Sequence, residues 1–169
     1  MCFELNAEPP IESTGGGSVL GQDLILQSAD GTQFATYTAL PQNPTGAGIV
    51  ILPDVRGLFH FYKELALRFA EAGVTAISID YFGRTSDIAT RGEDFDFMSH
   101  VMQTKFETLS ADIATAVAYL RGLPNPPRAI FTVGFCFGGS ISFNQAGNDQ
   151  NLAGVIGFYG NPVASRLGA

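Results

Sequence analysis

The sequence has no tryptophan, only two cysteines and few charged side chains, which make up 15% of its 169 residues. Two cysteines, Cys2 and Cys136, cannot build the framework of a disulfide-rich secreted domain, and no Cys-x-x-Cys motif indicates a metal or redox site. Nine basic residues against 16 acidic ones give a net charge of −7, which argues against a nucleic-acid-binding surface. We therefore expect a protein of the reducing cytoplasm that acts on a small molecule.

Long apolar runs are also missing. No stretch is long enough to span a membrane, and residues 1–18 lack the basic and then apolar pattern of a signal peptide. Hydrophobic residues nevertheless make up 46% of the chain, which is enough for a sizeable core. We expect a polar arm over residues 1–21, followed by one domain over residues 22–169.

The order of the apolar segments predicts an α/β fold, with a largely parallel sheet and helices on both of its faces. Asp30-Gly31 between two β-rich runs predicts an antiparallel hairpin at the start of this sheet. Continuous apolar runs predict strands buried on both faces, and a 3.6-residue period predicts helices. The expected strands are residues 23–27, 33–40, 47–52, 74–79, 129–135 and 152–159, the expected helices are residues 61–72, 106–120 and a helix start at 140–146, and residues 80–103 are expected to be an irregular loop.

The segment Gly134-Phe135-Cys136-Phe137-Gly138 lies between an expected strand and an expected helix. A nucleophile on a sharp strand-to-helix turn forms a nucleophile elbow, which requires very small residues two positions to either side. The side chain of Cys136 would then project near a helix N-terminus, where unpaired amides favour a thiolate and a developing oxyanion. The alternative is that Cys136 is a small core side chain, but the flanking glycines favour the nucleophile.

Three loops should meet at the carboxyl ends of the strands, where open α/β sheets carry their sites: residues 54–57, residues 80–84 and the elbow. The guanidinium of Arg84 could hold a substrate carboxylate, or it could form a structural ion pair. Asp54 could contribute to the site or could be a turn or helix-capping residue. An acidic group at residues 93–96 lacks a nearby histidine, so we interpret it as a solvated loop with a possible lid role and expect no metal site.

Four stretches of the sequence carry a resemblance to a known family. They are residues 52–58 (LPDVRGL), 79–84 (IDYFGR), 134–139 (GFCFGG) and 157–160 (GFYG). Together they resemble the dienelactone hydrolase family of α/β-hydrolases. This resemblance implies an α/β-hydrolase fold from about residue 23 to residue 162, and hydrolysis of a carboxylic ester or lactone by a Cys-Asp-His triad without a cofactor.

The resemblance also implies roles for individual residues. Cys136 would be the nucleophile, and the backbone N–H groups of Val55 and Phe137 would form the oxyanion hole. Asp54 occupies a position where the family carries a glutamate that contacts the resting thiol. Substrate contacts would come from Arg84, which matches the arginine that holds the substrate carboxylate, and from Tyr81.

The sequence departs from the family after Tyr159. The acid and the histidine of the triad follow the nucleophile in this fold, but residues 160–169 contain no Asp, Glu or His. His60 lies near the Asp54 loop and could act as a substitute base, whereas His100 is expected at the surface. We expect the chain to be the N-terminal two-thirds of the fold, with the triad acid and histidine in a missing C-terminal part.

Such a chain would leave the edge of the strand at residues 152–159 open for pairing with another chain. One alternative function is a truncated, non-catalytic homologue that binds small carboxylates through Arg84. Another is a thiol redox role for Cys136, which the lack of a nearby second cysteine disfavours.

Overall fold

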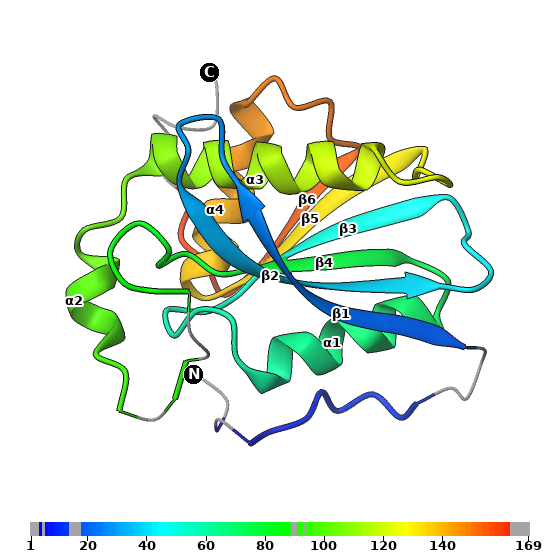
Figure 1. Ribbon diagram of the computed structural model, residues 1–169, viewed down its shortest axis with the longest axis horizontal. Coiled ribbons are helices and arrows are strands. Elements are labelled where there is room, and N and C mark those ends of the chain that lie inside the picture. The colour runs from blue at the N-terminus through cyan, green and yellow to red at the C-terminus, as the bar shows by residue number, and fades with distance from the viewer. Residues whose placement is uncertain (1–3, 5, 14–17, 89–90, 93, 163–169) are drawn as a thin grey trace.

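The computed structural model describes residues 4, 6–13, 18–88, 91–92 and 94–162 (Figure 1). This part of the chain forms a 6-stranded sheet with the strand order β1-β2-β4-β3-β5-β6. The strands are β1 (Val19–Gln27), β2 (Gln33–Pro41), β3 (Ala47–Leu52), β4 (Thr75–Ile79), β5 (Ala129–Phe135) and β6 (Gly154–Phe158). The helices are α1 (His60–Glu71), α2 (Phe97–Val101), α3 (Phe106–Arg121) and α4 (Phe137–Asn144), with a 3₁₀ turn, η1 (Gln145–Gly147), after α4.

The sheet is antiparallel at its start and parallel beyond it, as predicted. β1 pairs with β2 and β2 pairs with β4 in antiparallel fashion, whereas β4, β3, β5 and β6 run parallel to one another. Parallel strands end at the same edge of a sheet, so the segments that follow β3, β4, β5 and β6 all begin at one edge. The elbow and the two candidate loops therefore share this carboxyl edge.

β3 separates two hydrophobic cores. Val50 and Leu52 pack into the core beneath α3, whereas Ile49 and Ile51 pack into the core beneath α1. This alternation explains why the strand has no polar position, since both of its faces are covered. Figure 1 shows α1 on one side of the sheet and α3 on the other, which confirms the predicted layers.

The amphipathic helices were predictable from their periodicity. In α1, Tyr62, Leu65 and Ala66 are buried against the sheet, and Glu64 pairs with Arg68 one turn later at 3.7 Å. The helix start expected at residue 140 was placed too late, because α4 begins at Phe137, directly after the elbow.

The hairpin forms at the predicted place, with Gly31 at a φ of +87°. β1 is longer than expected and begins at Val19, which pairs with Pro41. Part of the polar arm lies along α1, because Ser13 Oγ donates to Glu71 and Arg68 Nε donates to the Ile11 carbonyl. The remainder of the arm, residues 1–3, 5 and 14–17, lies outside the described residues.

The segment between β4 and α3 is less irregular than expected, because it contains the short helix α2. Glu93, one of the acidic residues considered there, lies outside the described part of the chain, and its neighbours Asp94 and Asp96 are exposed. In the ranges that the structure covers, no helix has the length and apolar character needed to cross a membrane.

Candidate active site

Cys136 lies on a sharp turn between β5 and α4, as the elbow pattern predicts. Its backbone has φ 55° and ψ −115°, a left-handed region that residues other than glycine rarely adopt. Such a conformation costs on the order of 1–3 kcal/mol and persists only when the surrounding structure enforces it. The Cys136 side chain is only partly buried, so the alternative of an enclosed core cysteine does not fit its position.

Two glycines allow this turn because the backbone segments around it nearly touch. A Cβ on Gly134 would lie 1.9 Å from the carbonyl oxygen of Gly138, so β5 and α4 could not approach as they do. A Cβ on Gly138 would lie 2.1 Å from the Leu52 carbonyl oxygen and 2.3 Å from that of Pro53. The first turn of α4 therefore packs directly on the chain that leaves β3.

Two backbone N–H groups near the ends of β3 and β5 have no partner in the described residues. The N–H of Phe137 is the first of α4 and the N–H of Val55 follows the end of β3, and neither donates to another residue in the described ranges. Unpaired amides at a helix start are suited to binding an anion. The two donors that the resemblance implied for an oxyanion hole therefore remain available for a ligand.

Asp54 is buried and bound to a neighbouring arginine. Its Oδ2 accepts from Arg56 Nη2 at 2.7 Å, and its Oδ1 accepts from the Nε and the backbone N–H of the same residue. The Arg56 guanidinium also stacks on the ring of Phe59, with its central carbon 4.2 Å from the ring centroid. Asp54 thus stabilises the turn after β3, in agreement with the alternative that it is a turn residue. Its negative charge is paired with the positive charge of Arg56.

Tyr81 does not face solvent as a substrate contact would. Its side chain is 1% exposed, and its hydroxyl donates to the Pro53 carbonyl oxygen at 2.8 Å. Burial is the main cause that raises the pKa of Tyr81 well above its usual value, with smaller electrostatic contributions from Tyr62, Asp54 and Asp80. The phenol therefore stays a neutral hydrogen-bond donor within the protein.

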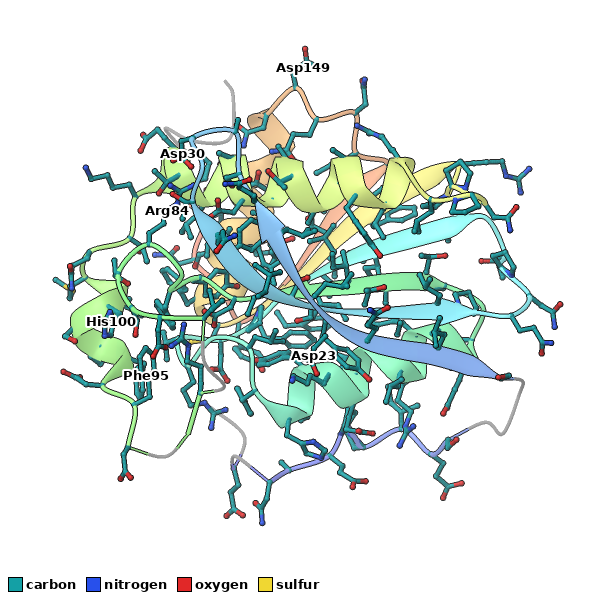
Figure 2. The ribbon with its side chains drawn as sticks, in the orientation of Figure 1. Asp23, Asp30, Arg84, Phe95, His100 and Asp149 are labelled. Carbon is teal, nitrogen blue, oxygen red and sulfur yellow. The ribbon has the colours of Figure 1, made fainter. Side chains whose placement is uncertain are left out.

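Arg84 joins α3 to the hairpin. Its guanidinium donates to both carboxylate oxygens of Asp112 and to the hydroxyl of Thr32. It also donates to Asp30, which lies beside it (Figure 2). These bonds raise the pKa of Arg84 and occupy the side chain, with the bonds to Asp112 as the largest cause. The geometry corresponds to the structural ion pair and not to a substrate anchor.

Asp80 connects three segments at the carboxyl edge. Its carboxylate accepts from the backbone N–H of Leu58 at 3.0 Å, from that of Phe82 at 3.1 Å, and from Arg91 Nη2 at 2.7 Å. Arg91 also lies over the ring of Phe95 at 4.5 Å. Both charged side chains of this ion pair are at most 3% exposed, so the pair fixes the segment after β4 against the loop after β3.

Neither histidine forms a hydrogen bond with Cys136 in the described residues. His60 is exposed at the start of α1. His100, which was expected at the surface, is partly buried and stacks on Phe95 with 4.9 Å between ring centroids (Figure 2). Its Nδ1 is buried without a hydrogen-bond partner in the part of the chain that the structure describes.

A cavity of about 520 Å³ lies between the N-terminal half of α3 and the length of α4. A separate cavity of about 410 Å³ lies between the β1–β2 ribbon and the first turns of α1. The first has an apolar wall that includes Phe137, and Lys105 and Asn161 stand among its polar lining residues. Phe137, the residue that follows Cys136, belongs to the wall of the first cavity.

Sequence reasoning missed Tyr62 and Asp112. Tyr62 was assigned only to the apolar face of α1, yet its hydroxyl accepts from the Asp54 N–H at 2.9 Å. Asp112 is 1% exposed within the apolar face of α3. An acidic residue at a buried helix position indicates an ion pair, because a buried carboxylate requires a partner. Arg84 could have been considered as that partner.

Comparison with known proteins gives a consistent result. The model of the dienelactone hydrolase family matches residues 34–168. Carboxymethylenebutenolidase 1 of Cupriavidus pinatubonensis is 25% identical over 148 residues, covering 84% of this chain but only 62% of that relative. A structure of a proposed dienelactone hydrolase from Klebsiella pneumoniae subsp. pneumoniae superimposes with a TM-score of 0.75 at 20% identity, covering 88% of this chain and 62% of the other. The α/β hydrolase GrgF from a Penicillium species gives a TM-score of 0.62 at 19% identity, covering 79% of this chain and 44% of the other, and these two structures show the α/β-hydrolase fold.

Proposed function

The chain belongs to the dienelactone hydrolase family, and from this we propose that it cleaves a carboxylic ester or lactone with the Cys136 thiolate as nucleophile. The observation that carries the proposal is the strained turn that presents Cys136 at the carboxyl edge of the sheet, next to the N–H of Phe137, which has no partner in the described residues. The chain covers 62% of one family relative and 54% of another, so the activity proposed is that of the whole protein.

The geometry suits acyl transfer. The thiolate would attack the acyl carbon to form a C–S bond, and the carbonyl electron pair would move onto oxygen. The N–H groups of Val55 and Phe137 would stabilise this oxyanion, which then collapses to expel the alkoxide and leaves a thioester on Cys136. Water would cleave the thioester, releasing the carboxylic acid and the thiol, and neither half of the reaction requires a cofactor.

Proton transfer requires residues that this arrangement does not supply. His60 is exposed on α1 and His100 is held against Phe95, so neither is placed to accept the proton of Cys136. We propose that the acid and the histidine of the triad follow β6 in a longer chain, which is the order in which this fold carries them. The 169-residue protein should then form the thioester slowly and release it poorly.

The alternative of a carboxylate-binding homologue depended on Arg84. Because Asp112 and Asp30 already occupy its guanidinium, this alternative has no support in the geometry. We further propose that the protein works in the reducing cytoplasm, where the Cys136 thiol stays free.

The test is acylation of the 169-residue protein by an activated aryl ester, followed by mass spectrometry of the intact chain. A Cys2→Ser background leaves Cys136 as the single thiol. We expect one acyl group per chain, accompanied by a burst of phenolate that Cys136→Ala abolishes. An undiminished burst in Cys136→Ala would exclude Cys136 as the nucleophile.

A further inference from the structure

One peptide group beside the elbow is held at both of its ends by buried tyrosines. The Pro53 carbonyl and the Asp54 N–H belong to the same planar peptide unit. The hydroxyl of Tyr81 donates to this carbonyl at 2.8 Å, and the hydroxyl of Tyr62 accepts from this N–H at 2.9 Å. One tyrosine comes from the segment after β4 and the other from α1, so two separate elements fix one peptide plane.

The same two tyrosines contact the residues on either side of the nucleophile. The ring of Phe135 lies 5.9 Å from that of Tyr62, and the ring of Phe137 lies 5.5 Å from that of Tyr81 in an edge-to-face arrangement. Packing against the two rings that flank Cys136 therefore fixes where the two tyrosine hydroxyls lie.

The peptide also lies directly beneath α4. The space at Gly138 is limited by the Leu52 and Pro53 carbonyls, so a tilt of the Pro53 carbonyl would change the contact between β3 and the elbow. The N–H of Val55 is one residue further along the chain. Rotation of the Pro53–Asp54 plane would therefore redirect the Val55 N–H relative to the sulfur of Cys136.

Both phenols are suited to a permanent role of this kind. Tyr62 is 0% exposed and Tyr81 is 1% exposed, and burial is the main reason that the pKa of each lies above its usual value. Each hydroxyl therefore keeps its proton, so that Tyr81 continues to donate to the Pro53 carbonyl.

We infer that Tyr62 and Tyr81 are positioning residues, which clamp the Pro53–Asp54 peptide so that the Val55 N–H points at the oxyanion formed on attack by Cys136. This inference rests on the proposed function. It assigns to Tyr81 the role of holding the backbone that precedes Val55, and not that of contacting the substrate. It also gives Tyr62 a role beyond packing.

The experiment compares two reactions of the same sulfur in the Cys2→Ser background. Acylation by p-nitrophenyl acetate passes through an oxyanion, whereas alkylation by iodoacetamide is a direct displacement at carbon that forms none. Single-turnover rates over a range of reagent concentrations separate the limiting acylation rate from apparent binding. The variants are Tyr62→Phe, Tyr81→Phe and both together, with Tyr119→Phe on α3 as a matched control.

We expect each single variant to acylate about tenfold more slowly at saturating ester, with alkylation changed by less than about twofold. Because both hydroxyls hold one peptide, the double variant should lose less than the product of the two single losses. Tyr119→Phe should acylate at the rate of the background protein, and thermal melts should show that all variants are folded.

The outcomes are distinguishable. Acylation at the background rate in both tyrosine variants overturns the clamp and leaves the proposed function standing. A parallel fall of acylation and alkylation also overturns it, because that result reports a general loss of structure around Cys136. If Cys136 in the background protein is not acylated at all, the proposed function fails and the clamp fails with it.

Discussion

The guanidinium of Arg84 binds both carboxylate oxygens of Asp112, with Nη2 2.6 Å from Oδ1 and Nε 3.2 Å from Oδ2. The Asp112 carboxylate also accepts from the hydroxyl of Ser28, next to the hairpin turn. This network joins α3, the segment after β4 and the β1–β2 hairpin, all of which meet at one end of the sheet. Asp112 lies 28 residues from Arg84 and 84 residues from Ser28 in the sequence.

Replacing Arg84 should therefore affect stability. In Arg84→Met the Asp112 carboxylate, whose side chain is 2% exposed, loses its cationic partner, and we expect the free energy of unfolding to fall by about 3 kcal/mol. Urea denaturation followed by circular dichroism measures this change, and Arg128→Met at an exposed site is the control. An unchanged urea midpoint together with weaker binding of small carboxylates would instead restore Arg84 as a substrate anchor.

The Asp30 carboxyl should make stability depend on pH in the acid range. Its hydrogen bond to Arg84, followed by that to the Thr32 N–H, lowers the pKa of Asp30 from 3.8 to about 2. A carboxyl with a lowered pKa in the folded state contributes stability that is complete above pH 3.8 and is lost as the pH falls through about 2.

The comparison between the wild-type protein and Asp30→Asn measures this contribution. The difference in their free energies of unfolding should be constant well above pH 3.8 and should shrink as the solution is acidified toward pH 2. A difference that does not change over this range would show that the Asp30–Arg84 contact does not form in solution.

The elbow glycines should not tolerate a methyl group. In Gly138→Ala the new Cβ would meet the Leu52 carbonyl oxygen at 2.1 Å, and we expect a loss of about 3 kcal/mol or more, or failure to fold. Gly122→Ala is the matched control, because its nearest contact is 3.5 Å and its φ of −83° suits any residue. That variant should be unchanged or more stable by up to about 1 kcal/mol. Equal melting temperatures for the two variants would contradict the close packing of α4 on β3.

The open edge of β6 should cause self-association of the 169-residue protein. Ile156 is 42% exposed and Phe158 is 47% exposed on this strand, which within the described residues pairs only with β5. Ile156→Lys should shift the sedimentation profile toward monomer, since a lysine disfavours pairing at a strand edge. Ile25→Lys on β1, where Ile25 is 54% exposed, should leave the sedimentation profile unchanged. A monodisperse wild-type monomer would contradict this prediction.

Elements with a strong local pattern were predictable from the sequence. The apolar run of β3 was placed with its observed bounds, and Tyr62, Leu65 and Ala66 of α1 were correctly assigned to the buried face. The elbow was predictable because its requirements are local: a strand is followed by a turn in which Cys136 lies between two glycines within five residues. The helix α2 was missed because its five residues include no buried side chain and so have no periodic apolar face.

Partners distant in the sequence were not predictable in the same way. A lone arginine such as Arg84 fits either a substrate or an acid, and only the fold brings Asp112 to it across 28 residues. Tyr62 lies only eight residues from Asp54, but on an apolar helix face a tyrosine resembles a core residue. The role of its hydroxyl can be inferred only when the position of the Asp54 N–H is known.

The strand order also determines the sequence of events during synthesis. β2 does not pair with β3, the next strand in the chain, but with β4, which begins at Thr75. The N-terminal hairpin therefore leaves the ribosome without an acceptor until β3, α1 and β4 have followed it. In the nascent chain, the β1–β2 hairpin can therefore join the sheet only after β4 has been synthesised.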